Sequence, residues 1–280
     1  MGWLYMEGLI DRAAKALVGS KYAVALTGAG ISTESGIPDF RGPEGIWTRD
    51  KEAEERAYQT YDLFLEDPRA YWEEMTDPRR ARGGFYHEIS RAKPNRGHYA
   101  LAELEKRGIL KCVITQNIDG LHEKAGSKRV LEYHGSVSRL RCLSCGARYR
   151  VEEVSLEKLP PRCRCGEVLK SDVVYFKEPI PADVAEKSEE EAVKCDLMLI
   201  CGTSAAVYPF ASLPLLAKFR FKSLPAELPV AGYRTGVKII EVNAEPTPLT
   251  REGVSDYLIQ GKTGEILPRI VEQVKKVSPG

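Results

Sequence analysis

Four cysteines stand close together in the sequence and are spaced like the ligands of a metal ion. Two residues separate Cys142 from Cys145, one residue separates Cys163 from Cys165, and 17 residues lie between the two pairs. Four thiolates can surround one tetrahedral Zn²⁺ and leave no open position on the ion for a substrate or an activated water. The sequence therefore predicts one structural zinc ion.

A glycine-rich turn follows the first strongly apolar run. Gly28 and Gly30 lie in the segment LTGAGIS (26–32), where they allow a tight turn and a close approach of backbone N–H groups to a phosphate. The usual dinucleotide fingerprint has a third glycine at the position of Thr33. On these residues alone, a nucleotide site and a tight turn without a ligand are equally good interpretations.

Polar side chains follow the next two apolar runs. Gln116, Asn117 and Asp119 come directly after LKCVIT, and His134 comes directly after VLEY. The carboxyl ends of parallel strands meet at one edge of a sheet, where ligands bind. Amides and a carboxylate can hold ribose hydroxyls or a carboxamide there, and His134 is the candidate general base.

These residues need a sheet to position them, and the hydrophobic pattern predicts one. Short apolar runs rich in β-branched residues alternate with segments of helical period, which indicates βαβ units and a mainly parallel sheet covered by helices on both faces. The expected strands are 22–27, 110–115, 130–133, 197–201, 237–242 and 257–259. The expected helices are 9–18, 98–106, 182–193, 209–219 and 263–277.

Two segments interrupt this alternation. Residues 41–96 are charged, aromatic and helix-like, and residues 136–172 carry the cysteine cluster. We expect these insertions to form a small domain from a helical module and a zinc module. Residues 1–40, 97–135 and 173–280 then form the α/β domain, from which 220–236 extends as a surface excursion.

Composition excludes several classes of protein. The 280 residues are 43% hydrophobic and carry a formal net charge of +1, too little for a field that attracts nucleic acid or an anionic membrane. The longest apolar runs, such as 197–201, are too short to span a membrane. The first residues include Glu7 and Asp11 and do not resemble a secretory signal. We therefore expect a cytoplasmic protein with neither nucleic acid nor a membrane as partner.

The other three cysteines support the same compartment. Cys112, Cys195 and Cys201 stand singly in or beside apolar runs, and the total of seven is odd. This arrangement argues against a disulfide framework, so we expect these three to be small buried hydrophobic residues in a reducing environment.

Taken together and in order, the motifs resemble those of the sirtuins, a family of NAD-dependent protein-lysine deacylases. The resemblance covers nearly the whole chain. The matching segments are GAGIS (28–32), ESGIPDFRG (34–42), TQNIDGLH (115–122), EYHGS (132–136), the four cysteines, VVYF (173–176), GTS (202–204), VYPFASLP (207–214), VN (242–243) and GKTGE (261–265).

The resemblance implies a Rossmann-like NAD-binding domain and a small domain with one structural zinc ion. NAD and an acyl-lysine protein substrate meet in the cleft between the domains, and the products are nicotinamide, free lysine and O-acyl-ADP-ribose. Chromatin proteins and metabolic enzymes are both implied as substrate proteins.

It also implies a role for individual residues. His134 acts as general base on a ribose hydroxyl, and Asn117 orients the ribose and a bound water. The implied cofactor-binding residues are Gly28, Ala29, Gly30 and Ser32 at the pyrophosphate, Asp39, Phe40 and Arg41 in the following loop, Gln116, Asn117, Ile118 and Asp119 at the nicotinamide ribose and carboxamide, Gly202, Thr203, Ser204 and Asn243 at the adenosine, and Glu245 and Thr263. Val174 and Phe176 belong to the segment that pairs with the substrate peptide.

Two positions depart from the family pattern. Lys177 stands where family members commonly have glycine, beside the segment that binds the peptide. Sirtuins that prefer succinyl or malonyl groups carry a Tyr-x-x-Arg pair, and Met75 and Pro78 stand at its positions. We therefore expect acetyl or a longer neutral acyl group as substrate.

Three other functions fit parts of the sequence. Mono-ADP-ribosyl transfer to protein could use the same cofactor site. A zinc-ribbon nucleic-acid-binding protein would explain the cysteines and their arginine neighbours, but the near-neutral charge and the polar cluster count against it. A module that only senses NAD would bind the cofactor without turnover.

Overall fold

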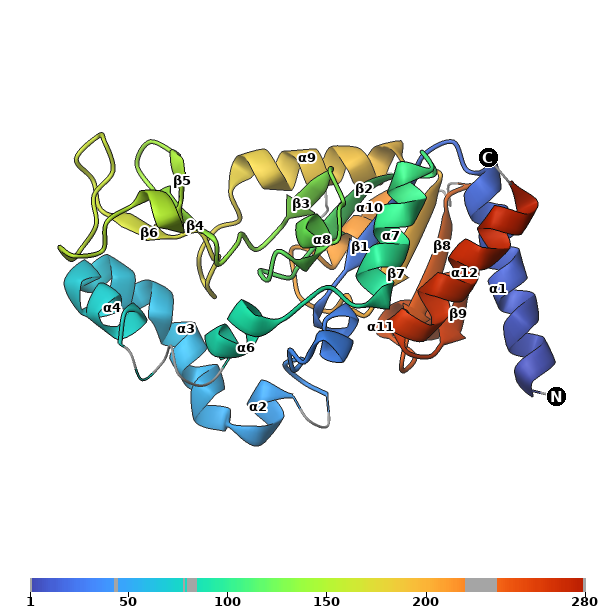
Figure 1. The fold of residues 1–280 in the computed structure, drawn as a ribbon, viewed down its shortest axis with the longest axis horizontal. Helices are drawn as coiled ribbons and strands as arrows, with labels where there is room; N and C mark the ends of the chain where they lie inside the picture. The colour runs from blue at the N-terminus through green and yellow to red at the C-terminus, as the bar shows by residue number, and fades with distance from the viewer. Residues whose placement is uncertain (1, 43–44, 78, 80–84, 220–235, 279–280) are drawn as a thin grey trace.

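The computed structural model describes residues 2–42, 45–77, 79, 85–219 and 236–278 (Figure 1). Pro78 and, apart from Gly236, the excursion expected at 220–236 lie outside the described residues.

A six-stranded parallel sheet forms the centre of the larger part of the molecule. Its strands are β1 (Ala23–Thr27), β2 (Leu110–Thr115), β3 (Val130–Glu132), β7 (Leu197–Cys201), β8 (Lys238–Asn243) and β9 (Tyr257–Gln260), in the spatial order β3-β2-β1-β7-β8-β9. The boundaries predicted from the apolar runs agree with these within one residue. From β1 the chain moves outward to β2 and β3 and then returns to pair β7 on the other side of β1. The switch in direction between β1 and β7 is where an open parallel sheet binds its ligand.

Helices cover both faces of this sheet (Figure 1). On one face, α1 (Gly2–Gly19), α7 (Arg96–Lys106) and α12 (Thr263–Val277) pack on one hydrophobic cluster. On the other, α9 (Ala182–Lys194), α10 (Ser212–Phe219) and α11 (Pro248–Arg251) contribute to a second cluster. Neighbouring residues of β8 alternate between the two, with Ile239 in the second cluster and Ile240 in the first. Burial on both faces explains why the strands are continuously apolar.

The first helix is longer than predicted. It begins at Gly2 rather than at residue 9, while α12 keeps the predicted bounds 263–277. The pattern before Leu9 carried little helical signal, because Leu4 and Tyr5 are exposed and make no apolar stripe toward the sheet.

The described residues of the segment 41–96 are mainly helical, as predicted. It contains α2 (Ile46–Arg49), α3 (Lys51–Glu66), α4 (Pro68–Met75) and α6 (Phe85–Arg91). Asp50 and Asp67 cap α3 and α4 by accepting hydrogen bonds from backbone N–H groups of the first turn.

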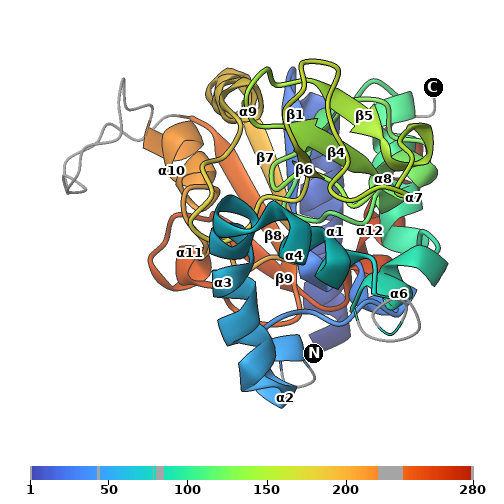
Figure 2. The ribbon, with the colours of Figure 1, turned by 90° about the vertical axis from the view of Figure 1, so that its left-hand side faces the viewer.

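A second, antiparallel sheet carries the cysteine cluster. Its strands are β4 (Arg139–Cys142), β5 (Arg148–Arg150) and β6 (Leu169–Ser171), in the order β5-β4-β6. Trp72 of α4 donates its indole N–H to the carbonyl of Leu169 at 2.7 Å, and both lie in one apolar cluster with Phe64 and Leu140. The helical and cysteine-containing segments thus pack together at one end of the molecule (Figure 2).

Short elements complete the described chain. They are the 3-10 turns η1 (Ala29–Ile31), η2 (Thr33–Ser35) and η3 (Val151–Glu153) and the helix α8 (Leu121–Lys124). Among the described residues, no helix is both long and apolar enough to cross a membrane.

Candidate active site

A cavity of about 1070 Å³ lies at the carboxyl ends of the central strands, between the parallel sheet and the helical segment. Of the catalytic, cofactor-binding and substrate residues named from the sequence, all but Gly28 line it. Those that it brings together are Ala29, Gly30, Ser32, Asp39, Phe40, Arg41, Gln116, Asn117, Ile118, Asp119, His134, Val174, Phe176, Gly202, Thr203, Ser204, Asn243, Glu245 and Thr263.

Two glycine-containing loops meet where β1 and β7 end. Gly30 donates its backbone N–H to the carbonyl of Gly202 at 2.8 Å. A Cβ on Gly30 would lie 2.8 Å from that carbonyl oxygen, and a Cβ on Gly202, whose φ is +61°, would lie 2.3 Å from the backbone nitrogen of Ile31. Only glycine permits this approach, which brings the two loops together at the cavity.

The turn after β1 also explains the missing third glycine. Instead of one long helix, the chain forms η1 and then η2, which ends at Gly36 with a φ of +86°. Thr33 lies on the second short turn, where its hydroxyl donates to the carbonyl of Gly30. No long helix has to pack closely at that position, so a third glycine is not required.

Asn117 connects the two polar segments of the cavity. Its side-chain amide donates to the carbonyl of Gly28 at 3.1 Å and to the hydroxyl of Ser32 at 3.0 Å. Ser32 in turn donates to a carboxylate oxygen of Asp119 at 2.7 Å, and the other oxygen accepts the N–H of Leu121. Burial raises the pKa of Asp119 because it disfavours the charged carboxylate. These bonds fix the three side chains relative to one another.

A second set of bonds holds the far end of the cavity. Gln116 donates its side-chain N–H to the hydroxyl of Thr203 at 2.7 Å, and Asn243 donates to the carbonyl of Thr203 at 2.8 Å. The ends of β2, β7 and β8 are thereby joined by side-chain hydrogen bonds.

His134 is held in a defined tautomer. Its Nδ1 lies 3.2 Å from the carbonyl oxygen of Gln116, which can only accept, so Nδ1 carries the proton and Nε2 keeps a lone pair. Burial lowers the pKa of His134 to about 4. The imidazole is therefore neutral at neutral pH and able to accept a proton at Nε2.

Aromatic side chains form one wall of the cavity. Phe40, Trp47, Phe85 and Phe176 line it, and the ring of Phe40 lies 4.8 Å from Trp47 and 5.5 Å from Phe85. Tyr58, which is not among the lining residues, stacks on Phe176 at 4.2 Å. The sequence motifs included Phe40 and Phe176 but not Trp47, Tyr58 or Phe85. The only available signal for these three was the aromatic content of residues 41–96.

The segment after β6 lies beside the His134 loop. Val174 donates its backbone N–H to the carbonyl of His134 at 2.9 Å. Among the described residues, no protein group bonds the carbonyl of Val174 or the N–H of Phe176. These groups can hydrogen-bond an extended peptide.

The four cysteines of the cluster form a separate site in the small sheet. Their sulfur atoms all lie within 4.8 Å of one another, with Sγ–Sγ distances of 3.6 Å between Cys142 and Cys165 and between Cys145 and Cys163. Four sulfurs at about 2.3 Å from one tetrahedral Zn²⁺ are about 3.8 Å apart, so the residues fit the ion.

The three other cysteines are buried, as predicted. Burial raises the pKa of Cys112 to about 12 and that of Cys201 further still, and Cys195 is also inaccessible. Such thiols are unreactive.

Comparison with known proteins identifies the family. The model of the Sir2 family matches residues 28–209. The NAD-dependent protein deacylase 2 of Archaeoglobus fulgidus is 46% identical over 281 residues, covering 97% of this chain and 98% of the relative. The NAD-dependent protein deacylase of Thermococcus kodakarensis is 42% identical over 280 residues, covering 96% of this chain and 97% of the relative.

Solved structures are similar over the same length. A Sir2 homologue in complex with NAD is 40% identical, with a TM-score of 0.72 over 95% of this chain and 94% of that one. Sir2Af2 bound to a myristoylated histone peptide is 39% identical, with a TM-score of 0.64 over 96% of this chain and 98% of that one. The family model, the relatives that are 42% and 46% identical over nearly the whole chain, and the parallel sheet all lead to the same assignment. The chain belongs to the Sir2 family.

Proposed function

We propose that this chain is an NAD-dependent protein-lysine deacylase, which releases nicotinamide and free lysine and forms O-acyl-ADP-ribose. The observation that carries the proposal is the bond between Val174 and His134, because the segment that we assign to the peptide then lies beside a neutral imidazole in the cavity that we assign to NAD. The names of the relatives, which are NAD-dependent protein deacylases, support it.

NAD binding is assigned to the two loops that meet after β1 and β7. The turn formed by Gly28, Ala29 and Gly30 is assigned to the pyrophosphate, and Gly202, Thr203 and Asn243 to the adenosine half. Asp119 and Ile118 bind the carboxamide, and the bonded set of Asn117 and Ser32 fixes Asp119 for it. When bound, NAD would supply a ribose carbon that carries nicotinamide as a leaving group. The acyl oxygen would bond to that ribose carbon as nicotinamide leaves.

His134 accepts the ribose hydroxyl proton at Nε2. The carbonyl of Gln116 holds the proton on Nδ1, so the ring need not rotate before it acts. Phe40, packed against Trp47 and Phe85, shields the reacting sugar from water.

The acyl-lysine peptide adds as an extended strand to Val174 and Phe176. The unused carbonyl and N–H of these residues provide its main-chain partners, and the solved relative with a myristoylated histone peptide supports such a substrate class. Chromatin proteins and metabolic enzymes are the protein substrates that we propose.

The acyl group is neutral. Aromatic residues form the wall beside Phe176, and two cations near it are paired: Arg56 contacts Asp50 at 3.0 Å, and Lys177 contacts Asp62 at 2.5 Å. A third cation, Arg41, lies over the ring of Trp47 and is assigned to the NAD phosphates. A carboxylate on the acyl chain would have to compete with these partners.

The zinc ion is structural, because four thiolates complete its coordination. We also propose the division into an α/β domain (1–40, 97–135 and 173–280), a helical module (41–96) and a zinc module (136–172). The cytoplasm is the proposed compartment, since four metal-binding thiols require a reducing environment.

Product analysis tests the proposed reaction. The chain is incubated with NAD and an acetyl-lysine peptide, and the peptide and nucleotide products are identified by mass spectrometry. Deacylation gives O-acetyl-ADP-ribose and an unmodified lysine. A peptide or protein that instead gains ADP-ribose would replace the proposal with mono-ADP-ribosyl transfer.

A further inference from the structure

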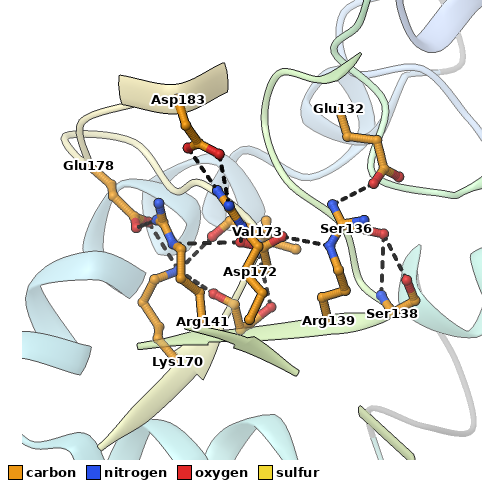
Figure 3. Close-up of polar contacts among 12 residues, drawn as sticks. Glu132, Ser136, Ser138, Arg139, Arg141, Lys170, Asp172, Val173, Glu178 and Asp183 are labelled. Carbon is orange, nitrogen blue, oxygen red and sulfur yellow. Dashed lines mark hydrogen bonds and ion pairs between the residues drawn. The ribbon is translucent and has the colours of Figure 1, made fainter. Parts of the chain in front are cut away.

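A network of buried charges joins the small cysteine-containing sheet to the segment that carries Val174 and Phe176 (Figure 3). Arg141 on β4 and Lys170 on β6 both contact the carboxylate of Glu178, at 2.5 Å and 3.0 Å. Arg139 on β4 contacts Glu132 at the end of β3 and Asp172. The cations come from the small sheet, and the anions flank the cavity.

Lys170 occupies an unusual position for a lysine. It is completely buried, and its ammonium group has three acceptors, the carbonyls of Ser171 and Val173 at 2.5 and 2.6 Å and the carboxylate of Glu178. An ammonium group has three N–H donors, so every donor is used. The ring of Tyr175 lies 4.4 Å from the nitrogen. A buried charge is costly unless it is fully paired, and here each partner belongs to residues 171–178.

Glu178 transmits this contact to the backbone. Besides the two cations, its carboxylate accepts the N–H of Tyr175 at 3.0 Å, and its own N–H donates to the carbonyl of Tyr175. The two bonds close a turn in which Lys177 has a φ of +68°. The direction of the chain at Phe176 therefore depends on where Glu178 is held.

The same segment is tied to the His134 loop from its other end. Gly135 has a φ of +73°, and a Cβ there would lie 1.9 Å from the carbonyl oxygen of Asp172. With the bond from Val174 to His134, this contact leaves the segment little freedom on that side. Arg141 and Lys170 constrain the other end through Glu178, and Lys170 alone of the two also binds the carbonyl of Val173.

From this geometry we infer that Lys170 is a positioning residue for the acyl-peptide segment, through which the zinc module controls peptide binding. Lys170 does not line the cavity and touches neither proposed substrate. The inference rests on the proposed deacylase function. It differs from a purely stabilising role, which would affect NAD, peptide and zinc binding alike.

The test uses the zinc-loaded full chain and three single variants. Lys170→Met removes the donors at similar length, and Glu178→Gln breaks the link from the segment's side. Lys158→Met is the matched control, because Lys158 is an exposed lysine of the same module. Fluorescence anisotropy measures binding of a labelled acetyl-lysine peptide, calorimetry measures binding of ADP-ribose, and elemental analysis measures zinc.

We expect Lys170→Met and Glu178→Gln each to raise the peptide Kd at least about tenfold. The peptide Kd of the double variant should be at most about twofold higher than that of either single variant, since both substitutions remove the ion pair between Lys170 and Glu178. ADP-ribose affinity should change less than about twofold, zinc should stay at one per chain, and Lys158→Met should match the unmodified chain.

Three results would overturn the inference. Unchanged peptide affinity in both variants would show that the contact does not position the segment. Loss of folding in both, or equal loss of peptide and ADP-ribose affinity, would assign Lys170 a general stabilising role. An unmodified chain that neither binds nor deacylates the peptide would instead overturn the proposed function on which the inference depends.

Discussion

The carbonyl of His134 accepts the backbone N–H of Val174 at 2.9 Å, so the proposed base and the proposed peptide-binding segment are neighbours through the main chain. These residues are far apart in sequence and belong to segments on either side of the cysteine cluster. The small sheet that lies between them in sequence therefore determines how substrate and base meet.

Gly30→Ala is expected to weaken ADP-ribose binding at least about tenfold. The added Cβ would lie 2.8 Å from the carbonyl oxygen of Gly202, so the two loops that form the proposed pyrophosphate site must separate. Isothermal calorimetry measures the affinity.

Gly8→Ala is the control, because Gly8 is exposed on α1 and a Cβ there meets nothing within 4 Å. That change should leave binding unaltered and stabilise the helix by about 0.5–1 kcal/mol. Equal ADP-ribose affinity in Gly30→Ala and Gly8→Ala would contradict the assignment of these loops to the cofactor site.

Cys163→Ala should reduce bound zinc from one per chain to nearly none. Zinc binding contributes on the order of 10 kcal/mol to the folding of small modules, so the thermal unfolding midpoint should fall and a strong chelator should have the same effect on the unmodified chain. Elemental analysis and circular dichroism provide the readouts.

Cys201→Ala is the matched substitution outside the cluster. Cys201 is buried in the parallel sheet, so its loss should lower stability but leave zinc content unchanged. Retention of zinc by Cys163→Ala would contradict the four-thiolate site.

Acid should destabilise the fold through buried histidines. Burial lowers the pKa of His98 to about 4 and that of His122 well below its usual value, while an unfolded histidine titrates near 6.5. Between these values the unfolded state binds more protons, so the free energy of unfolding rises with pH. From pH 7 to pH 5 each buried histidine should cost about 2 kcal/mol.

Urea unfolding at several pH values measures this slope. His98→Asn should reduce the change in the free energy of unfolding between pH 7 and pH 5 by about 2 kcal/mol, the contribution of one buried histidine. His87→Asn, at a partly exposed position, should reduce this change little. A slope that is the same in His98→Asn and the unmodified chain would contradict burial of a neutral imidazole.

Acyl selection should favour neutral groups. We expect kcat/KM for an acetyl peptide to exceed that for a succinyl peptide at least about tenfold, because Arg56 and Lys177 are paired with acids and Arg41 is assigned to the NAD phosphates. Asp62→Asn frees Lys177 and should raise succinyl turnover by about two- to fivefold.

Glu66→Gln is the control for that change, since Glu66 is an exposed acid on the same helix. A preference for succinyl in the unmodified chain would overturn the neutral-acyl assignment. An equal gain in Asp62→Asn and Glu66→Gln would attribute the effect to net charge alone.

The parallel sheet was predictable because its strands are buried on both faces and read as continuous apolar runs. The short strands of the small sheet were not predictable. The strand β5, for example, has the sequence Arg-Tyr-Arg, which is too short and too polar to show the alternation of apolar and polar residues that indicates a strand. The helix α11 was missed because its four residues are too few to show a helical period.

Some residues of the candidate site could likewise be predicted from the sequence, and the charged network beside it could not. Its glycines and polar residues follow strands directly, so motif and topology both indicated them. Lys170, Arg141 and Glu178 carry no motif, and their pairing arises only when β4, β6 and the following segment pack together. Sequence patterns assign charged residues to the surface by default, which is why this buried network could not be predicted.

His134 is the proposed base in NAD-dependent deacylation. Mass spectrometry of an acetyl-lysine peptide, with and without NAD, compares the unmodified chain with His134→Ala and with His87→Ala as control. We expect loss of the acetyl group only with NAD, a rate reduced about 10²–10⁴-fold in His134→Ala, and nearly full activity in His87→Ala. Deacetylation that proceeds without NAD, or at an unchanged rate without the His134 imidazole, would contradict this proposal.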